Sequence, residues 1–305
     1  MAKTKLASHE FRISTDQVRQ DYRRRRATEL EPQLTRRRAL AAEIATEASA
    51  HIPRDAGYLV CPPGTLDGVP AITQAARDIV AHVDPDEQQR KTLEQQQKKK
   101  ANKPFMVMLL DMESLTLDSP FIRFGLRRDI VATAAAYLGV VPILDYVNVM
   151  HSSHVADEPI KSQLYHCDSD EVEQVKVFIV CEPVTAETGP LTFLSAAQSQ
   201  VVRDRVGYMY DSKLTDQAVS DVLGSSVHET ALVGEPGTTA FLDTSRCFHY
   251  GSRVTDTSAH RLVVMLQYVT PLAFVYPENP LEGARFRRLA HPSQDELTSM
   301  VLGGV

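Results

Sequence analysis

A histidine and a carboxylate separated by one residue are the first sign of chemistry in this sequence. His166 and Asp168 close the stretch Gln163–Asp168. Side chains at positions i and i+2 of an extended strand point to the same face, so both could reach one metal ion. Two ligands hold a metal only loosely, and His249 is the candidate for the third. Two histidines and one carboxylate, with the other positions open, form the arrangement that suits non-haem Fe(II) in oxygenases.

An arginine follows the third candidate ligand at short range. An oxygenase that uses a 2-oxoacid must bind the distal carboxylate of that cosubstrate, and a guanidinium does so with a permanent charge and a planar fork. Arg261 lies twelve residues after His249. We expect a tight return between antiparallel neighbours to place Arg261 near the metal. Ser252 could add a hydroxyl to the same carboxylate, and Asn148 on the preceding strand is a further candidate contact to the cosubstrate.

Composition indicates an ordinary globular protein. The 305 residues are 43% apolar and 24% charged, which allows a sizeable core in one large β-domain or in two domains. A net charge of −6 gives no global attraction to nucleic acid or to an anionic membrane surface. No apolar run approaches the roughly 20 residues that a membrane-spanning helix needs. The start lacks an apolar signal segment, and the four cysteines form no CxxC pair. We expect a cytoplasmic protein that acts on a small molecule.

The first fifty residues combine two arginine runs with apolar residues at helical spacing. The runs lie at 23–26 and 36–38, and Pro32 is expected to separate two amphipathic helices. Local basic runs in an acidic chain are typical of a solvated helix face, which is the interpretation we favour. The alternative is a surface that docks a nucleic acid or an acidic carrier protein.

From residue 57 onward the sequence predicts strands with helices between them. Apolar runs favour strands at 57–61, 143–149, 175–181, 191–194, 237–242 and 261–269, and helices at about 66–81, 120–138 and 214–224. Gly139 is expected to end the helix 120–138. Six or so strands covered by helices from the N-terminal half describe a double-sheet jelly roll.

Three segments divide the chain in this interpretation. Residues 1–56 form a helical N-terminal extension, 57–280 the main domain, and 281–305 a tail with too little apolar pattern to place. The polar segment of about 84–103 is expected to be a solvated insertion, with a lid as the alternative. Arg123, Arg127 and Arg128 on the predicted helix 120–138 could reach a substrate, although surface charge is the simpler interpretation.

The order of the motifs resembles the phytanoyl-CoA dioxygenase family of Fe(II)/2-oxoglutarate-dependent oxygenases. The matching pieces are Gly57–Val60, Tyr137–Gly139, Leu164–Asp168, the ExGxL turn Glu187–Leu191, Gly237–Phe241, Phe248–Ser252 and Arg261. The resemblance covers roughly residues 57 to 275. It implies a mainly β fold with flanking helices, the double-stranded β-helix, which is a cupin-like jelly roll. It also implies Fe(II), 2-oxoglutarate and O2 as cofactor and cosubstrates, with His166, Asp168 and His249 as iron ligands and Arg261 as the 2-oxoglutarate anchor.

Two departures from the family pattern concern the substrate. Tyr165 precedes the first ligand where the family often has Trp or Leu, which makes Tyr165, together with Arg123, a candidate substrate contact. Residues 195–198 replace a PGSH-type sequence in a loop that faces the substrate in the family. Asp168 itself is retained, whereas related halogenases replace this carboxylate by a small residue.

The resemblance implies a dioxygenase that hydroxylates an unactivated C–H of a small organic molecule, as in specialised metabolism. Desaturation, epoxidation or cyclisation would use the same ligands. A cupin-like metal- or ligand-binding protein without turnover is the alternative from another class, and it has no reason to keep Arg261 beside the third ligand. If both histidines bind iron as neutral imidazoles, iron affinity should fall as the pH drops below their titration range.

Overall fold

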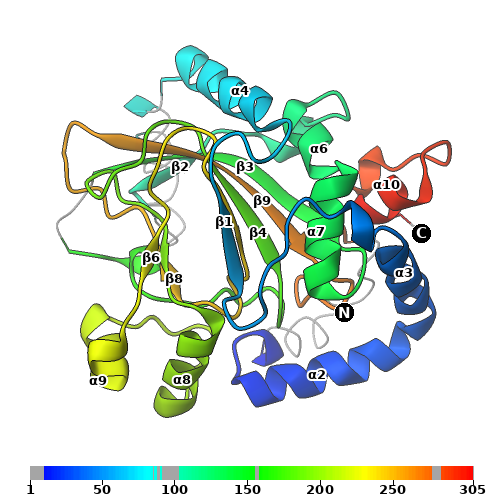
Figure 1. Ribbon diagram of the computed structural model, residues 1–305, viewed down its shortest axis with the longest axis horizontal. Coiled ribbons are helices and arrows are strands. Elements are labelled where there is room, and N and C mark those ends of the chain that lie inside the picture. Colours follow the sequence, from blue (N-terminus) through cyan, green and yellow to red (C-terminus); the bar gives the residue numbers. More distant parts are fainter. Residues whose placement is uncertain are drawn as a thin grey trace.

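An antiparallel sheet of six strands forms the centre of the computed structural model, which describes residues 10–84, 86–87, 90, 103–154, 158–276 and 283–304. Its strands stand in the order β1-β7-β4-β9-β3-β2 (Figure 1). They are β1 (Tyr58–Cys61), β2 (Met106–Met108), β3 (Ile143–Ser153), β4 (Val175–Val180), β7 (Thr239–Leu242) and β9 (His260–Val269). Apart from β2 and β3, strands that are neighbours in the sheet are not consecutive in the chain, so the chain leaves the sheet between visits.

Some of the strands between these segments form a second, smaller sheet. It contains β5 (Thr192–Phe193), β6 (Thr230–Ala231) and β8 (His249–Tyr250) in the order β6-β5-β8. An antiparallel bridge between His166 and His249 extends this sheet by one more segment. From β3 onward the chain passes back and forth between the two sheets, with β5 and β6 as consecutive strands of the small sheet, which is the winding of a double-stranded β-helix. The predicted mainly β jelly roll with flanking helices is confirmed.

Alternation of side chains along the strands gives the main sheet two different buried faces. Val264 and Leu266 of β9 point into the larger core, which helices complete, whereas Val263 and Met265 point into a second core shared with the small sheet. Strand β4 is divided in the same way, with Val177 on the helix side. Both faces of the sheet are buried, which explains the nearly continuous apolar runs in the sequence.

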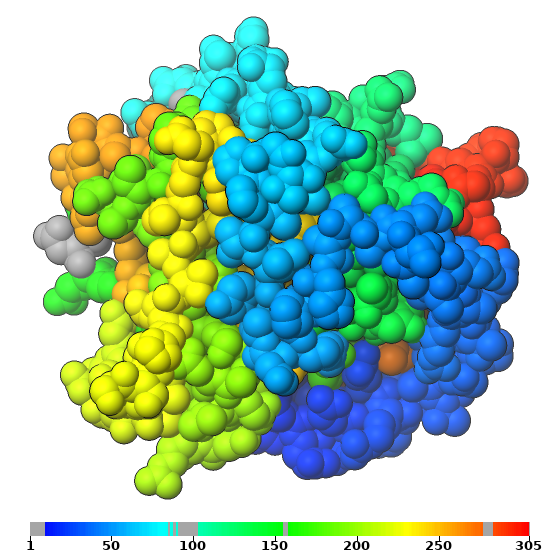
Figure 2. Space-filling view, in the orientation of Figure 1, coloured from blue at the N-terminus to red at the C-terminus, as the bar shows by residue number. Residues whose placement is uncertain are grey.

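Helices cover the main sheet on the side away from the small sheet (Figure 1). The α-helices within the described residues are α2 (Asp16–Glu29), α3 (Glu31–Glu43), α4 (Val69–His82), α6 (Pro120–Gly125), α7 (Arg128–Leu138), α8 (Ala196–Val206), α9 (Asp216–Leu223) and α10 (Glu296–Val301). Helices α8 and α9 lie beside the small sheet. Figure 2 shows the N-terminal part of the chain, in blue, wrapped along the lower right and the front of the molecule. None of the helices in the described ranges is both long and apolar enough to cross a membrane.

Two predictions about helices are corrected. The single helix expected over 120–138 is two helices, because Arg127 takes an extended backbone with ψ 131° between α6 and α7. Gly139 does end the second one, with a φ of 74°. The tail contains α10, whose Leu297 and Val301 are buried in the main core. Most of the predicted insertion at 84–103 lies outside the described residues, and the division into 1–56, 57–280 and 281–305 stays a prediction.

The arginine runs at the N-terminus are not uniformly solvated, which corrects the interpretation as a helix face in water. Arg24 and Arg38 are exposed, but Arg26 and Arg37 are buried. Arg37 donates hydrogen bonds of 3.0 Å to the carbonyls of Val141 and Met300, so it joins α3 to α10 and to the segment before β3. A buried guanidinium that donates to several carbonyls acts as a structural crosslink.

Arg19 of α2 makes the most direct connection between the N-terminal helices and the segment after Asp168. Its side chain is fully buried, it donates to the carbonyl of Glu171 at 2.6 Å, and its guanidinium lies 3.5 Å from the ring centroid of Tyr210. It also donates to the carbonyl of Ser169 at 3.2 Å. Helix α2 therefore fixes the backbone immediately after the candidate metal ligand.

Replacing Arg19 by methionine should lower the free energy of unfolding by about 3 kcal/mol, because buried carbonyls lose their donor. Urea denaturation followed by circular dichroism measures this change. Arg24→Met is the control, because Arg24 is exposed and pairs with Asp21 within the same helix; its effect should stay within about 0.5 kcal/mol. Equal effects of the two substitutions would contradict the crosslinking role.

Candidate metal and carboxylate site

The two candidate histidine ligands are direct partners across a pair of antiparallel segments. The backbone N–H of His166 donates to the carbonyl of His249 at 3.1 Å, and the N–H of His249 donates back to His166 at 3.0 Å. Side chains of such a pair stand on the same face. Their ring centroids lie 4.3 Å apart. The small sheet therefore brings together two residues that are far apart in the sequence.

Each of the two imidazoles is held in the form that a metal requires. Nδ1 of His166 lies 2.9 Å from the carbonyl of Leu164, and Nδ1 of His249 lies 3.0 Å from that of Cys247. A carbonyl can only accept, so Nδ1 carries the proton and Nε2 presents its lone pair. Burial lowers the pKa of His249 to about 4 and that of His166 well below its usual value. Both rings are thus neutral at physiological pH.

The Asp168 carboxylate completes the group. Its Oδ1 lies 4.0 Å from Nε2 of His166, and its Oδ2 lies 3.8 Å from Nε2 of His249. These three side chains form a candidate metal-binding group. Burial would raise the pKa of Asp168, but the ammonium of Lys176 outweighs it and holds that pKa well below its usual value. The donor set is one anionic oxygen and two neutral nitrogens, without a thiolate, which suits Fe(II).

Arg261 is a buried cation whose bonds within the described residues all go to neutral groups. It donates to the carbonyl of Gly189 at 2.7 Å and to Oγ of Ser252 at 2.9 Å, while its Nε has no hydrogen-bond partner in the structure. Oγ of Ser152 lies 3.4 Å from the same guanidinium. Burial lowers the pKa of Arg261 only to about 10, so it stays charged. An uncompensated buried charge is costly, and a carboxylate ligand would compensate it.

One cavity of about 130 Å³ joins the metal group to the arginine. The predicted site residues His166, Asp168, His249, Ser252 and Arg261 all line it. The prediction of a tight return between antiparallel neighbours is wrong, however, because β8 belongs to the small sheet and β9 to the main sheet. The residues converge because the two sheets face each other. Their assignment as iron and cosubstrate ligands stays a prediction.

Two other predicted site residues lie elsewhere. The side chain of Asn148 is bonded to the backbone of Leu110, with its Oδ1 3.2 Å from the N–H and its Nδ2 3.3 Å from the carbonyl. It does not line the cavity. Tyr165 alternates with His166 along the chain and therefore points to the opposite side, where it is buried and donates to the carboxylate of Glu229. The structure does not bring either residue to the metal group.

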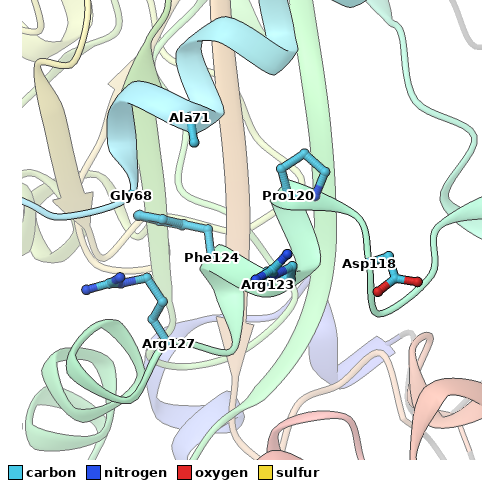
Figure 3. A pocket seen from close by; sticks show the side chains of 7 residues that line it. All are labelled: Gly68, Ala71, Asp118, Pro120, Arg123, Phe124 and Arg127. Atoms are coloured by element: carbon cyan, nitrogen blue, oxygen red, sulfur yellow. The ribbon is translucent and has the colours of Figure 1, made fainter.

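Arg123 lines a different cleft (Figure 3). This cleft of about 450 Å³ lies between α4 and α6, with Ala71 on one side and Phe124 and Arg127 on the other. Arg127 itself is paired with Asp129 at 3.1 Å. Arg123 is exposed and is absent from the lining of the metal cavity. A contact between Arg123 and a substrate at the metal group therefore has no support in the geometry.

Sequence reasoning missed several polar residues of the cavity region, of which Ser152 and Lys176 contact predicted site residues. Ser152 is the cross-strand partner of Arg261 and lies between the sheets, which follows from the strand register alone. Lys176 lines the cavity and places its Nζ 2.7 Å from Oδ2 of Asp168. A single lysine within the apolar run 175–180 was a signal that could have been used, because an ammonium is rarely buried without a partner.

Fold and site together define a double-stranded β-helix that carries a two-histidine, one-carboxylate group. No protein-family model matches the sequence, and no curated protein sequence matches it. Among solved structures, the epimerase SnoN in complex with Fe3+, alpha ketoglutarate and nogalamycin RO has 16% identity and a TM-score of 0.46, covering 77% of this chain and 85% of that one. EctD from S. alaskensis with 2-oxoglutarate and 5-hydroxyectoine has 17% identity and a TM-score of 0.44, covering 73% of this chain and 74% of that one.

Gly189 connects the ExGxL turn to Arg261 and has a φ of 70°. A Cβ there would lie 2.7 Å from the backbone of Arg253, so Gly189→Ala should cost about 2 kcal/mol or more of unfolding free energy. Gly207→Ala is the matched control, since Gly207 has a φ of 60° but nothing within 4 Å of its Cβ position. It should cost about 1 kcal/mol. Urea denaturation of both variants tests this, and equal losses would contradict the close approach at Gly189.

Proposed function

We propose that this protein is an Fe(II)- and 2-oxoglutarate-dependent dioxygenase that hydroxylates an unactivated C–H of a small organic molecule. The observation that carries the proposal is the combination in one cavity of neutral imidazoles, a carboxylate and an uncompensated buried arginine. A protein that only binds a metal has no use for the arginine. A protein that only binds a dicarboxylate has no use for the histidine pair.

The residues present fit the iron and the cosubstrate. His166 and His249 would hold Fe(II) through Nε2, and Asp168 through its carboxylate. Arg261 would bind the distal carboxylate of 2-oxoglutarate, because its guanidinium is buried and has only neutral partners in the described chain. When bound, the iron activates O2, and the oxidative decarboxylation of 2-oxoglutarate to succinate and CO2 provides the oxidant for the substrate C–H.

The protein itself orients the groups that bind the iron and the cosubstrate, and it excludes water from the cavity. Nδ1 of each histidine is fixed by a backbone carbonyl, so Nε2 is aimed into the cavity. Ser252 accepts from the guanidinium of Arg261 and thereby fixes its orientation. A further set of side chains forms an apolar wall of the cavity: Met106, Met108, Met150, Phe178, Leu191 and Met265.

This apolar wall supports a substrate whose reacting part is hydrocarbon. Methionine side chains are flexible and polarizable, so they adapt to an apolar surface of irregular shape. They also keep water away from the C–H that is to be oxidised. Desaturation, epoxidation or cyclisation would begin with the same residues, and hydroxylation is the simplest of these outcomes.

Product formation under labelled oxygen tests the proposal. The protein is incubated with Fe(II), 2-oxoglutarate and a panel of small apolar compounds under 18O2, and succinate and products are measured by mass spectrometry. We expect succinate that requires both Fe(II) and O2, and a product that gains one labelled oxygen atom. Succinate together with a product that has lost two hydrogens and gained no oxygen would contradict hydroxylation. No succinate with any compound would contradict the whole proposal.

A further inference from the structure

Lys176 is a polar cavity residue for which the proposed function gives no role, although its ammonium contacts a candidate metal ligand. It lies on β4 between Val175 and Val177, both fully buried, and its side chain is 12% exposed. The lysine lies on the face of β4 that is turned to the small sheet, as does Phe178, and both line the cavity. Its ammonium is therefore inside the site rather than in water.

The ammonium of Lys176 engages one of the two oxygens of Asp168. Nζ lies 2.7 Å from Oδ2, and Nε2 of Gln174 lies 3.4 Å from the same oxygen. Oδ1 accepts no hydrogen bond from the residues that the structure describes, and it is the oxygen nearer to Nε2 of His166, at 4.0 Å. Oδ2 of the carboxylate is therefore already hydrogen-bonded to Lys176, whereas Oδ1 is available to bind a metal.

We propose that Lys176 is a positioning residue that restricts Asp168 to a single metal-binding oxygen and so keeps a coordination position open for 2-oxoglutarate. The inference rests on the proposed function. A carboxylate can bind a metal through one oxygen or both, and binding through both would require Oδ2 to give up its charge-assisted hydrogen bond. The positive charge acts in the same direction, because it opposes the approach of a metal cation and favours that of a dianionic cosubstrate.

Two affinities with opposite expected changes test this role. Lys176→Met keeps the length of the side chain and removes the ammonium. We expect the affinity for Co(II) to increase about tenfold and the affinity of the Co(II) form for 2-oxoglutarate to decrease about tenfold, because the charge and the hydrogen bond both disappear. Anaerobic titration calorimetry measures both. The visible absorption of bound Co(II) should weaken, since a second oxygen from Asp168 raises its coordination number.

A matched control separates contact from charge alone. Lys161 is exposed and does not line the cavity, so Lys161→Met should leave both affinities within about threefold of the wild type, as for a charge screened by water. If Lys176→Met does not fold, Lys176→Gln replaces it. That variant removes the charge and keeps a donor, so both changes should have the same signs and a smaller size.

The outcomes distinguish the two proposals. Wild-type protein that binds neither Co(II) nor 2-oxoglutarate contradicts the proposed function. If the wild-type protein binds both, the proposed function stands. A Lys176→Met variant in which the metal affinity falls, or the 2-oxoglutarate affinity is unchanged, then contradicts only the role of Lys176. General damage to the site would lower both affinities together, so a gain in one with a loss in the other supports the positioning role.

Discussion

Replacing Asp168 by alanine is expected to abolish both metal binding and turnover. Asp168 is the one anionic member of the metal group and faces Nε2 of both His166 and His249. Without it, two neutral imidazoles remain, and the ammonium of Lys176 would lie beside the cation without its carboxylate partner. The loss should exceed the roughly 10- to 100-fold that removal of an outer-shell partner costs. Anaerobic calorimetry with Fe(II) and measurement of succinate test the two effects.

A control variant shows whether the loss is specific. Asp211→Ala removes a carboxylate from an exposed position that does not line the cavity, and we expect it to keep full metal binding and turnover. Unchanged succinate formation by Asp168→Ala would remove Asp168 from the ligand set.

Replacing Arg261 by lysine should weaken 2-oxoglutarate binding while leaving metal binding intact. Lysine keeps the charge but lacks the fork, so it cannot hold Ser252, Gly189 and a carboxylate at once as Arg261 is placed to do. The loss of one charge-assisted hydrogen bond is worth about 2 kcal/mol, which is roughly a thirtyfold rise in the 2-oxoglutarate concentration required. Succinate formation as a function of 2-oxoglutarate concentration measures it, and calorimetry with Fe(II) shows whether the metal still binds.

The control for this prediction is Arg253→Lys. Arg253 lies eight residues earlier and pairs with Asp216 at 2.7 Å, outside the cavity. Its replacement should leave the 2-oxoglutarate requirement unchanged. If Arg261→Lys also leaves the required 2-oxoglutarate concentration unchanged, another residue holds the distal carboxylate.

The part of the site that the sequence predicted follows from local rules. His166 and Asp168 share a face because strand side chains alternate, and the same rule sends Tyr165 and Cys167 into the cluster on the opposite side. The apolar runs located every strand of the main sheet except β2. The order of the motifs, through the resemblance that they carry, predicted the double-stranded β-helix that the two sheets form.

The part that was missed depends on contacts between distant segments. Nothing local to Lys176 shows that its ammonium reaches Asp168, because that contact is set by the position of β4 relative to the segment before it. Arg26 and Arg37 belong to the arginine runs that were interpreted as a solvated helix face, yet both are buried and donate to carbonyls more than 100 residues away. The break between α6 and α7 follows Gly125, the last residue of α6, but a single glycine within an apolar helical pattern is tolerated, so the periodicity continued through it.

The most direct test of the central claim is the anaerobic absorption spectrum of the Fe(II) protein on addition of 2-oxoglutarate. A 2-oxoacid bound to Fe(II) gives a weak visible charge-transfer band. We expect this band to appear and to saturate with one equivalent of 2-oxoglutarate. It should be lost in Asp168→Ala, and in Arg261→Lys it should need a higher 2-oxoglutarate concentration. Wild-type protein that binds Fe(II) tightly but shows no band with excess 2-oxoglutarate would contradict the account.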